Sequence, residues 1–285
     1  MNRTPVDDPT FKQIAELFRY DRSVSLDAVT VGDWPHRIPY VIEKIRYRSV
    51  HNETVPGYFV CPKGAKGKRY PAVLLIHGTN SFWGKNEDWS LWWLDILARS
   101  GLCVLVIDNF GFGERKHGDE VSWLGMEPHA LRDWVVQNVI DQRRGIDYLF
   151  TRAEVDTTKI GLFGGSMGGY IGTMVAGLED RLSVVVLMVT RPWPYAPTDH
   201  PLLRYGHTLN FAPRITAPVM MVSATGDGIK TAEELFGLMP EPKRLVWYKS
   251  GHYIPPEKSN KEILEWLDLY LSPKGPKGHP STIDN

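Results

Sequence analysis

The chain has 285 residues, of which 42% are hydrophobic and 23% charged, an ordinary balance for a globular protein. Its 33 basic and 33 acidic residues cancel, so the net charge gives no reason to expect binding to nucleic acid or to an anionic membrane. The opening stretch MNRTPVDDPTFKQ lacks the apolar core of a secretory signal, and no apolar run reaches the roughly 18–20 residues of a membrane span. We therefore expect a cytoplasmic protein.

The first 71 residues predict a small helix and a hairpin. Residues 10–20 read as a short amphipathic helix within an amino-terminal extension, 1–40. Two strand-like runs in 41–60 flank His-Asn-Glu-Thr, which predicts an antiparallel hairpin. A loop rich in Pro, Gly and Lys follows at 62–71.

From residue 72 onward, short apolar runs alternate with helical patterns. The predicted buried strands are 72–78, 102–108, 159–165, 182–189, 217–224 and 243–250. The predicted helices are 87–101, 127–150, one beginning at Ser166, and 257–271. This alternation predicts the α/β class, with a mostly parallel sheet covered by helices on both faces.

Two segments break this rhythm. The Pro-rich segment 190–216 has no clear period, and we predict a short cap or lid within a domain that covers 41–271. The final residues, 272–285, predict a flexible tail.

The cysteines and glycines give no sign of a cofactor. Cys61 and Cys103 lie at the edges of apolar runs, and we interpret them as small core side chains rather than as a disulfide. The chain has no metal-binding motif such as H-E-x-x-H. The glycines of 164–169 fit neither a phosphate-binding loop nor a dinucleotide fingerprint, so no cofactor is predicted.

One serine stands where a nucleophile would. Ser166 lies in Gly164-Gly165-Ser166-Met167-Gly168, between a predicted strand and a predicted helix, which is the context of a nucleophile elbow. Glycines two residues before and after the serine avoid collisions across the sharp turn. The plainer interpretation is a small residue in a tight strand–helix junction.

A general base and an acid should follow this serine along the chain. Of the later histidines, His252 is favoured because it comes directly after the last predicted strand. Asp227 follows the fifth strand between two glycines, where a carboxylate could orient an imidazole. A loop histidine and a turn aspartate are the plainer interpretations.

The stretch HGTN after the first long strand predicts half of an oxyanion hole. The backbone amides of Thr79 and Met167 are the expected donors. We interpret His77 as a structural group that fixes this loop.

A second loop, VIDNFGFGERKHGD, contains further charged residues near the site. Asp108 is expected to fix that loop. Glu114, Arg115 and His117 could touch substrate or form ion pairs.

With HGTN, GGSMGG, TGDG and SGH in this order, the chain resembles the α/β-hydrolase superfamily over residues 40–271. It looks most similar to single-domain esterases related to acetylxylan esterases and to the catalytic domains of dipeptidyl-peptidase-like enzymes. The resemblance implies Ser166 as nucleophile, Asp227 as acid and His252 as base, with the Thr79 and Met167 amides as oxyanion hole. A serine rather than a cysteine departs from dienelactone hydrolases, and the short amino-terminal extension departs from oligopeptidases with a propeller.

The sequence therefore predicts a serine hydrolase that cleaves a small carboxylic ester through an acyl-enzyme. Trp83, Trp193 and Tyr195 are predicted to line the substrate pocket, while the Trp-rich stretch 83–93 could serve the core, the pocket or an interface. Amide, thioester or carbon–carbon hydrolysis on the same residues stays open, as does a ligand-binding protein without activity. The oligomeric state is also open, a homodimer included.

Overall fold

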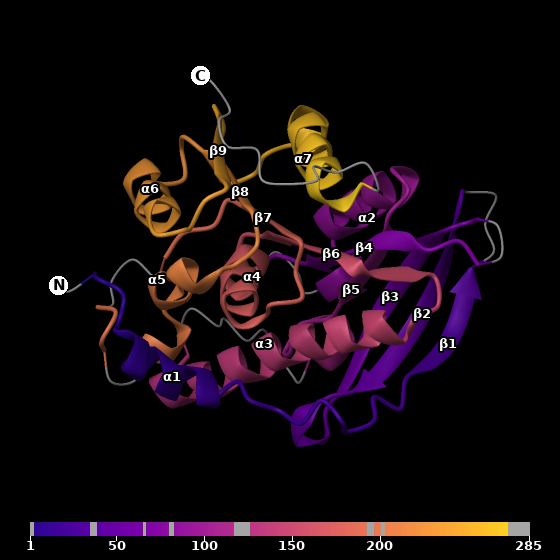
Figure 1. The fold of residues 1–285 in the computed structure, drawn as a ribbon, viewed down its shortest axis with the longest axis horizontal. Coiled ribbons are helices and arrows are strands. Elements are labelled where there is room, and N and C mark those ends of the chain that lie inside the picture. The colour runs from indigo at the N-terminus through magenta and orange to yellow at the C-terminus, as the bar shows by residue number, and fades with distance from the viewer. Residues whose placement is uncertain are drawn as a thin grey trace.

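A nine-stranded sheet forms the centre of the protein in a computed structural model (Figure 1). The structure describes residues 3–34, 39–64, 67–79, 83–116, 126–192, 197–200 and 203–272. The strands lie in the order β1-β2-β3-β5-β4-β6-β7-β8-β9. The pairs β1–β2, β2–β3 and β3–β5 are antiparallel, and the remaining neighbours, from β5–β4 to β8–β9, pair parallel. The strands are β1 (Val29–Trp34), β2 (Tyr40–Arg48), β3 (Thr54–Pro62), β4 (Tyr70–Ile76), β5 (Cys103–Ile107), β6 (Val155–Gly165), β7 (Val184–Met188), β8 (Val219–Ala224) and β9 (Lys243–Tyr248).

Helices cover both faces of this sheet. In Figure 1, α2 and α7 lie together on one side, while α3, α4 and α5 lie on the other. The helices are α1 (Asp8–Glu16), α2 (Asp88–Arg99), α3 (Pro128–Thr151), α4 (Met167–Leu178), α5 (Thr208–Phe211), α6 (Ile229–Gly237) and α7 (Pro256–Leu271). Short 3-10 turns are η1 (Val50–Asn52), η2 (Gly84–Asn86), η3 (Gly113–Arg115), η5 (Arg204–Gly206) and η6 (Ala212–Arg214).

The continuous apolar runs of the sequence form strands that are buried on both sides. Along β4, Leu74 and Ile76 enter the core under α3 and α4, while Val73 and Leu75 enter the core under α2 and α7. Successive side chains of a strand point to opposite faces, so a strand between two helix layers must be apolar throughout. The predicted α/β-hydrolase fold, with its antiparallel hairpin, is confirmed.

The edge strand β1 is not among the predicted strands, because the sequence predicts only a helix within 1–40. The helix is present as α1, but Val29–Trp34 pairs antiparallel with β2 at the edge of the sheet. Val29 and Val31 are 52% and 44% exposed. An edge strand that buries no apolar face lacks the pattern by which strands are recognised.

The interpretation of the cysteines as separate core side chains is wrong, since the structure joins Cys61 and Cys103 in a disulfide. Strands β3 and β5 pair antiparallel with Val60 opposite Val104, which places Cys61 opposite Cys103 with 4.2 Å between their Cα atoms. In the sheet, β3 lies beside β5 and not beside β4, the next strand along the chain, so the sequence alone does not reveal that the two cysteines meet.

The amino-terminal segment fastens two later parts of the chain. Arg3 pairs with Glu234 of α6 at 2.7 Å. The Val6 amide donates to Asn210 Oδ1 at 3.0 Å, and its carbonyl accepts from Arg214 Nη2 at 2.9 Å. The described part of segment 190–216 packs against α4 through α5 and η6. Its role as a cap stays a prediction.

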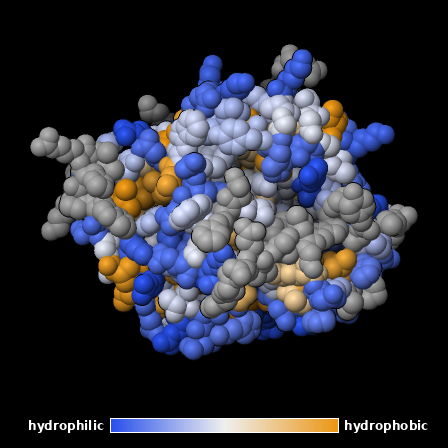
Figure 2. Space-filling view, turned by 180° about the vertical axis from the view of Figure 1, so that it is seen from behind, coloured by the Kyte–Doolittle hydropathy of each residue, from blue (hydrophilic) through white to orange (hydrophobic). Residues whose placement is uncertain are grey.

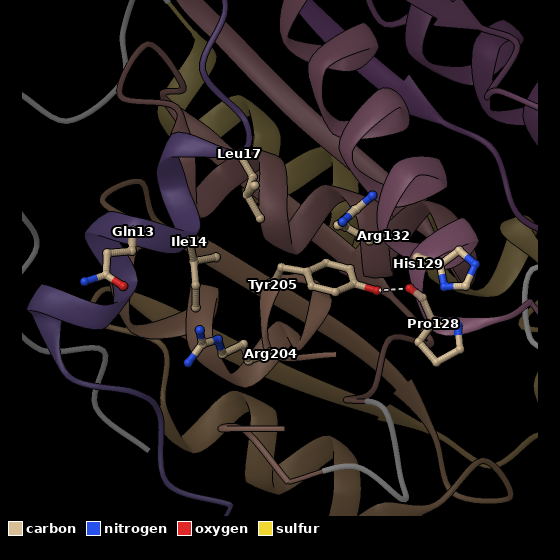
Figure 3. Close-up of a pocket in the computed structure, with 8 residues that line it drawn as sticks. All are labelled: Gln13, Ile14, Leu17, Pro128, His129, Arg132, Arg204 and Tyr205. Carbon is tan, nitrogen blue, oxygen red and sulfur yellow. Dashed lines mark hydrogen bonds between the residues drawn. The ribbon is translucent and has the colours of Figure 1, made fainter. Parts of the chain in front are cut away.

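The surface is mixed in character. Seen from behind, apolar side chains lie in separate patches among polar ones (Figure 2). A cavity of about 280 Å³ lies between α1, the start of α3 and η5, where the Tyr205 hydroxyl donates to the Pro128 carbonyl (Figure 3). None of its lining residues belongs to the predicted site. No helix among the described residues is long and apolar enough to cross a membrane.

Candidate active site

Ser166 occupies a strained turn between β6 and α4. Its backbone has φ 55° and ψ −117°, a region that residues with a Cβ rarely adopt. A Cβ on Gly168 would lie 2.0 Å from the Ile76 carbonyl oxygen, and one on Gly164 would lie 2.2 Å from the Gly168 carbonyl oxygen. The predicted steric need for glycine on both sides of the serine is confirmed.

His252 and Asp227 meet Ser166 at the carboxyl end of the sheet. His252 Nε2 lies 2.8 Å from Ser166 Oγ, and His252 Nδ1 lies 2.8 Å from Asp227 Oδ2. A carboxylate only accepts, so Nδ1 carries the proton and Nε2 accepts from the serine hydroxyl. The structure thus brings together the three residues that the sequence selects, in an unbroken chain of hydrogen bonds.

The turns after β8 and β9, which carry Asp227 and His252, are fixed by backbone hydrogen bonds, one between the turns and one within the first. Gly226 N donates to the Ser250 carbonyl at 3.0 Å, and Asp227 N donates to the Ala224 carbonyl at 3.1 Å. Asp227 is 11% exposed, whereas His252 is 50% exposed. The acid is therefore shielded while the imidazole remains open to a substrate.

The loop after β4 lies beside the serine. A Cβ on Gly78 would lie 3.6 Å from the Cβ of Ser166, which places the Gly78–Thr79 backbone next to the hydroxyl. Met167 begins α4, and the first amides of a helix have no acceptor within it. Both predicted oxyanion donors therefore belong to backbone that borders Ser166. Residues 80–82 lie outside the described residues.

A buried glutamate that the sequence analysis does not single out fixes this loop. Glu87, 6% exposed, accepts from the Gly78 amide at 2.7 Å and from Ser90 Oγ at 3.0 Å through the same oxygen. The signal in the sequence is faint, because an acidic residue just before a helix reads as an ordinary helix start. Its burial is what identifies its role.

His77 has the structural role predicted for it. It is fully buried, its Nδ1 donates to the Gly78 carbonyl at 2.9 Å, and its Nε2 accepts from the Asn109 amide at 3.0 Å. These partners assign the proton to Nδ1 and link the loops that follow β4 and β5.

Asp108 fixes the second loop, as predicted. It accepts from the Lys85 backbone amide at 2.8 Å and from Lys85 Nζ at 2.6 Å. Lys85 Nζ also donates to Glu114 at 2.6 Å, and Glu114 pairs with Lys44. Burial lowers the pKa of the Lys85 ammonium, but the carboxylates of Asp108 and Glu114 raise it by more, so the group stays charged.

Arg115 is buried and pairs with Asp141 at 2.6 Å and with Glu53 at 3.1 Å. Of the alternatives for Glu114 and Arg115, ion pairing is the one that the structure shows. His117 lies outside the described residues.

Three large side chains that lie near site residues in the sequence are exposed. Trp83 is 63% exposed, Ile229 comes two residues after Asp227 and is 42% exposed, and Tyr253 follows His252 and is 55% exposed. Trp193 and Tyr195 lie outside the described residues, so their predicted place in the pocket stays a prediction.

The Trp-rich stretch 83–93 serves the core in part: Trp83 and Trp92 are exposed, while Trp89 and Trp93 pack inward. Trp93 is fully buried, and both Trp89 and Trp93 contact Phe163 edge to face. Trp89 also lies against Gly165, where a Cβ would come within 2.5 Å of its ring. Among the described residues, no three His, Cys, Asp or Glu side chains cluster as metal ligands would.

The sheet order and the Ser166–His252–Asp227 chain at its carboxyl end define the class of α/β hydrolases. A family model described as "Alpha/beta hydrolase family" matches residues 73–270. The chain therefore belongs to this family.

Among relatives, the protein YtaP of Bacillus subtilis is 32% identical over 180 residues, 55% of this chain and 59% of its own length. Dipeptidyl peptidase 8 of Homo sapiens is 30% identical over 216 residues, 72% of this chain but 22% of its own length. The chain thus spans less than two thirds of the length of either relative. The solved acetyl xylan esterase from Paenibacillus sp. R4 superposes with a TM-score of 0.74 at 20% identity, covering 95% of this chain and 97% of that one.

Proposed function

We propose that the protein is a serine hydrolase of carboxylic esters. The observation that carries this proposal is the hydrogen-bonded chain from Ser166 Oγ through His252 to Asp227, with 2.8 Å at each step. A hydroxyl paired to an oriented imidazole becomes a nucleophile when the imidazole takes its proton.

The proposed reaction has two halves. Ser166 Oγ attacks the ester carbonyl carbon while His252 Nε2 takes the hydroxyl proton, and the amides of Thr79 and Met167 hold the developing oxyanion. The carbon–oxygen bond to the alcohol then breaks, and His252 returns the proton to the departing alcohol. Water adds to the acyl-enzyme by the same route, which releases the carboxylic acid and restores Ser166.

Several structural neighbours carry names that support an ester as substrate. Two are acetyl xylan esterases, with TM-scores of 0.74 and 0.73, and one is a methylesterase. These likenesses are at 20% identity or below, so they support the fold directly and the substrate only by analogy. The exposed apolar side chains of Trp83, Ile229 and Tyr253 suit an acyl or aryl group.

Peptide-bond hydrolysis is the second candidate, since human dipeptidyl peptidase 8 aligns over 72% of this chain. A panel of acetylated sugars, short- and long-chain acyl esters, aryl esters and peptide amides separates the two. We expect turnover of esters. Turnover of peptide amides alone would replace the ester proposal with the peptidase one.

A fluorophosphonate probe tests the nucleophile directly. We expect it to modify Ser166 in the folded protein, as located by peptide mass spectrometry, and to modify neither Ser166→Ala nor unfolded protein. Ser183→Ala is a matched control, because Ser183 lies at the opposite end of β7 and bonds the Thr158 carbonyl. Absence of label on Ser166 in folded wild-type protein would contradict the proposal.

A further inference from the structure

The residue that follows β7 is strained next to the candidate nucleophile. Val189 has φ 45°, in the left-handed region that a β-branched residue seldom adopts. Such a conformation is energetically unfavourable and persists only where the surroundings enforce it. Here Val189 N donates to the Val222 carbonyl at 2.7 Å, while the preceding Met188 carbonyl accepts from Ser166 N at 2.9 Å.

This strained turn determines where the next two residues lie. Thr190 is pressed under α4, since a Cβ on Gly169 would come within 1.6 Å of Thr190 Oγ1. Arg191 then extends toward the turn that holds the acid. Three residues span at most about 11 Å, so the Arg191 backbone lies within that reach of Met188, whose carbonyl binds the Ser166 amide.

Only one nitrogen of the Arg191 guanidinium, Nη1, contacts an acceptor in the described part of the chain. Its Nη1 donates to the Asp227 carbonyl at 3.0 Å and lies 3.4 Å from Asp227 Oδ1. Within the described part of the chain its other N–H groups contact no acceptor, and the side chain is 47% exposed. A guanidinium carries five donors in a fork that matches a carboxylate, so most of this fork is available to a bound molecule.

The charges around the site are unevenly placed. Helix α6 begins at Ile229, directly after the turn at Asp227, and its amino-terminal end adds partial positive charge on the side of Arg191. On the side of Tyr253, partial burial and the carboxylates of Glu257 and Asp88 raise the pKa of the tyrosine hydroxyl. An anionic group on a substrate would therefore be favoured toward Arg191 and disfavoured toward Tyr253.

We propose that Arg191 determines specificity by binding a carboxylate on the substrate, so that the preferred substrates are esters that carry a free acid group a few bonds from the scissile carbonyl. This inference rests on the proposed ester hydrolysis. The open edge of the guanidinium binds the carboxylate in a charge-assisted pair, while the engaged Nη1 keeps the side chain fixed against Asp227.

Two matched substrate pairs test the inference and separate the two sides of the ester. On the alcohol side, 4-acetoxybenzoate is compared with its methyl ester; on the acyl side, monomethyl adipate is compared with methyl hexanoate. We expect the wild-type kcat/KM of the anionic member to exceed that of the neutral member by about tenfold or more in one of the pairs, the scale of one charged hydrogen bond.

The variants Arg191→Gln and Arg191→Lys complete the test. Arg191→Gln should lower kcat/KM for the anionic ester about tenfold more than for the neutral one, and Arg191→Lys should keep part of the preference. The control Arg99→Gln removes an arginine of similar exposure, 52%, from an ion pair with Asp95 on α2, and should leave the ratio unchanged.

The outcomes are distinguishable. If esters are hydrolysed but neither pair shows a wild-type preference for the anionic member, or Arg191→Gln leaves that preference intact, the role of Arg191 is overturned while ester hydrolysis stands. If no ester in either pair or in the wider panel is hydrolysed, the proposed function fails and this inference with it.

Discussion

Ser166 and Val189 directly follow the neighbouring parallel strands β6 and β7, and both have a positive φ, at 55° and 45°. They are linked through one hydrogen bond, from Ser166 N to the carbonyl of Met188, the residue before Val189. Strain of this kind is stored where the surrounding structure enforces it, often at functional sites. Here the two strained junctions hold the candidate nucleophile and the segment that leads to Arg191.

Replacing Ser166 separates strain from chemistry. We expect the free energy of unfolding of Ser166→Gly to exceed that of Ser166→Ala by about 1 kcal/mol. Glycine adopts this conformation without a Cβ clash, and this gain outweighs its larger loss of backbone entropy on folding. Chemical denaturation of the two inactive variants measures the difference. An equal or lower stability for the glycine variant would show that the turn is not strained.

Asp227→Asn should lower kcat about 10⁴-fold with little change in KM, because an amide beside His252 Nδ1 favours the tautomer that cannot accept the serine proton. This expectation rests on the 2.8 Å distance between His252 Nδ1 and Asp227 Oδ2. Steady-state kinetics on the best ester of the panel measures it. Near wild-type kcat in a folded Asp227→Asn variant would assign the acid elsewhere.

Gly168→Ala should destabilise the fold by about 3 kcal/mol or more, since the new methyl group would meet the Ile76 carbonyl at 2.0 Å and backbone atoms cannot give way. Gly237→Ala is the matched control. Nothing lies within 4 Å of its Cβ position, so it should be neutral or stabilising by up to about 1 kcal/mol. Thermal unfolding of both variants compares them, and equal melting temperatures would refute the steric account.

Glu87→Ala should lower kcat about 10- to 100-fold, because the Gly78 amide loses its buried acceptor and the Gly78–Thr79 backbone is no longer held beside Ser166. Glu87→Gln keeps an acceptor oxygen at the same place and should lose much less. Kinetics on both variants, with circular dichroism to verify folding, makes the comparison. A Glu87→Gln variant as impaired as Glu87→Ala would indicate that the charge, and not the hydrogen bond, matters.

The buried carboxylate of Glu179 should make the stability of the fold depend on pH in the acid range. It is buried at 3% exposure beside the guanidiniums of Arg181, Arg143 and Arg22. Burial raises the pKa of its carboxyl, but the three arginines lower it by more, so the pKa lies below its ordinary value of 4.5. The stabilisation is therefore fully present above pH 4.5 and is lost as the pH falls through the lowered pKa.

Glu179→Gln should lower the free energy of unfolding by about 3 kcal/mol near pH 7. The difference from wild type should shrink as the pH falls toward 3. Denaturation at a series of pH values measures this. Glu16→Gln is the control, because Glu16 is 64% exposed in its pair with Arg19 and should show no such trend. A deficit that is independent of pH would contradict the account.

Much of the fold follows from the sequence, because the buried strands are continuous apolar runs and the connecting helices have clear periods. The contact between Ser166, Asp227 and His252 is also foreseeable, since the carboxyl ends of parallel strands share one edge of a sheet. The Cys61–Cys103 disulfide and strand β1 cannot be foreseen from the sequence in this way, because each depends on which strands become neighbours in the sheet. The burial of Glu87 and the strained turn before Arg191, on which its proposed role depends, are recorded by no local sequence pattern.

The bonds made by the first residues reach the site from a distance. Arg3 holds Glu234 on α6, the helix that begins two residues after Asp227, and Val6 holds Asn210 and Arg214 in the segment that follows Arg191. Proteolytic removal of Arg3 and Val6 would cut the ties to α6 and to the segment around Asn210 and Arg214 at once, and would leave every residue of the site in place.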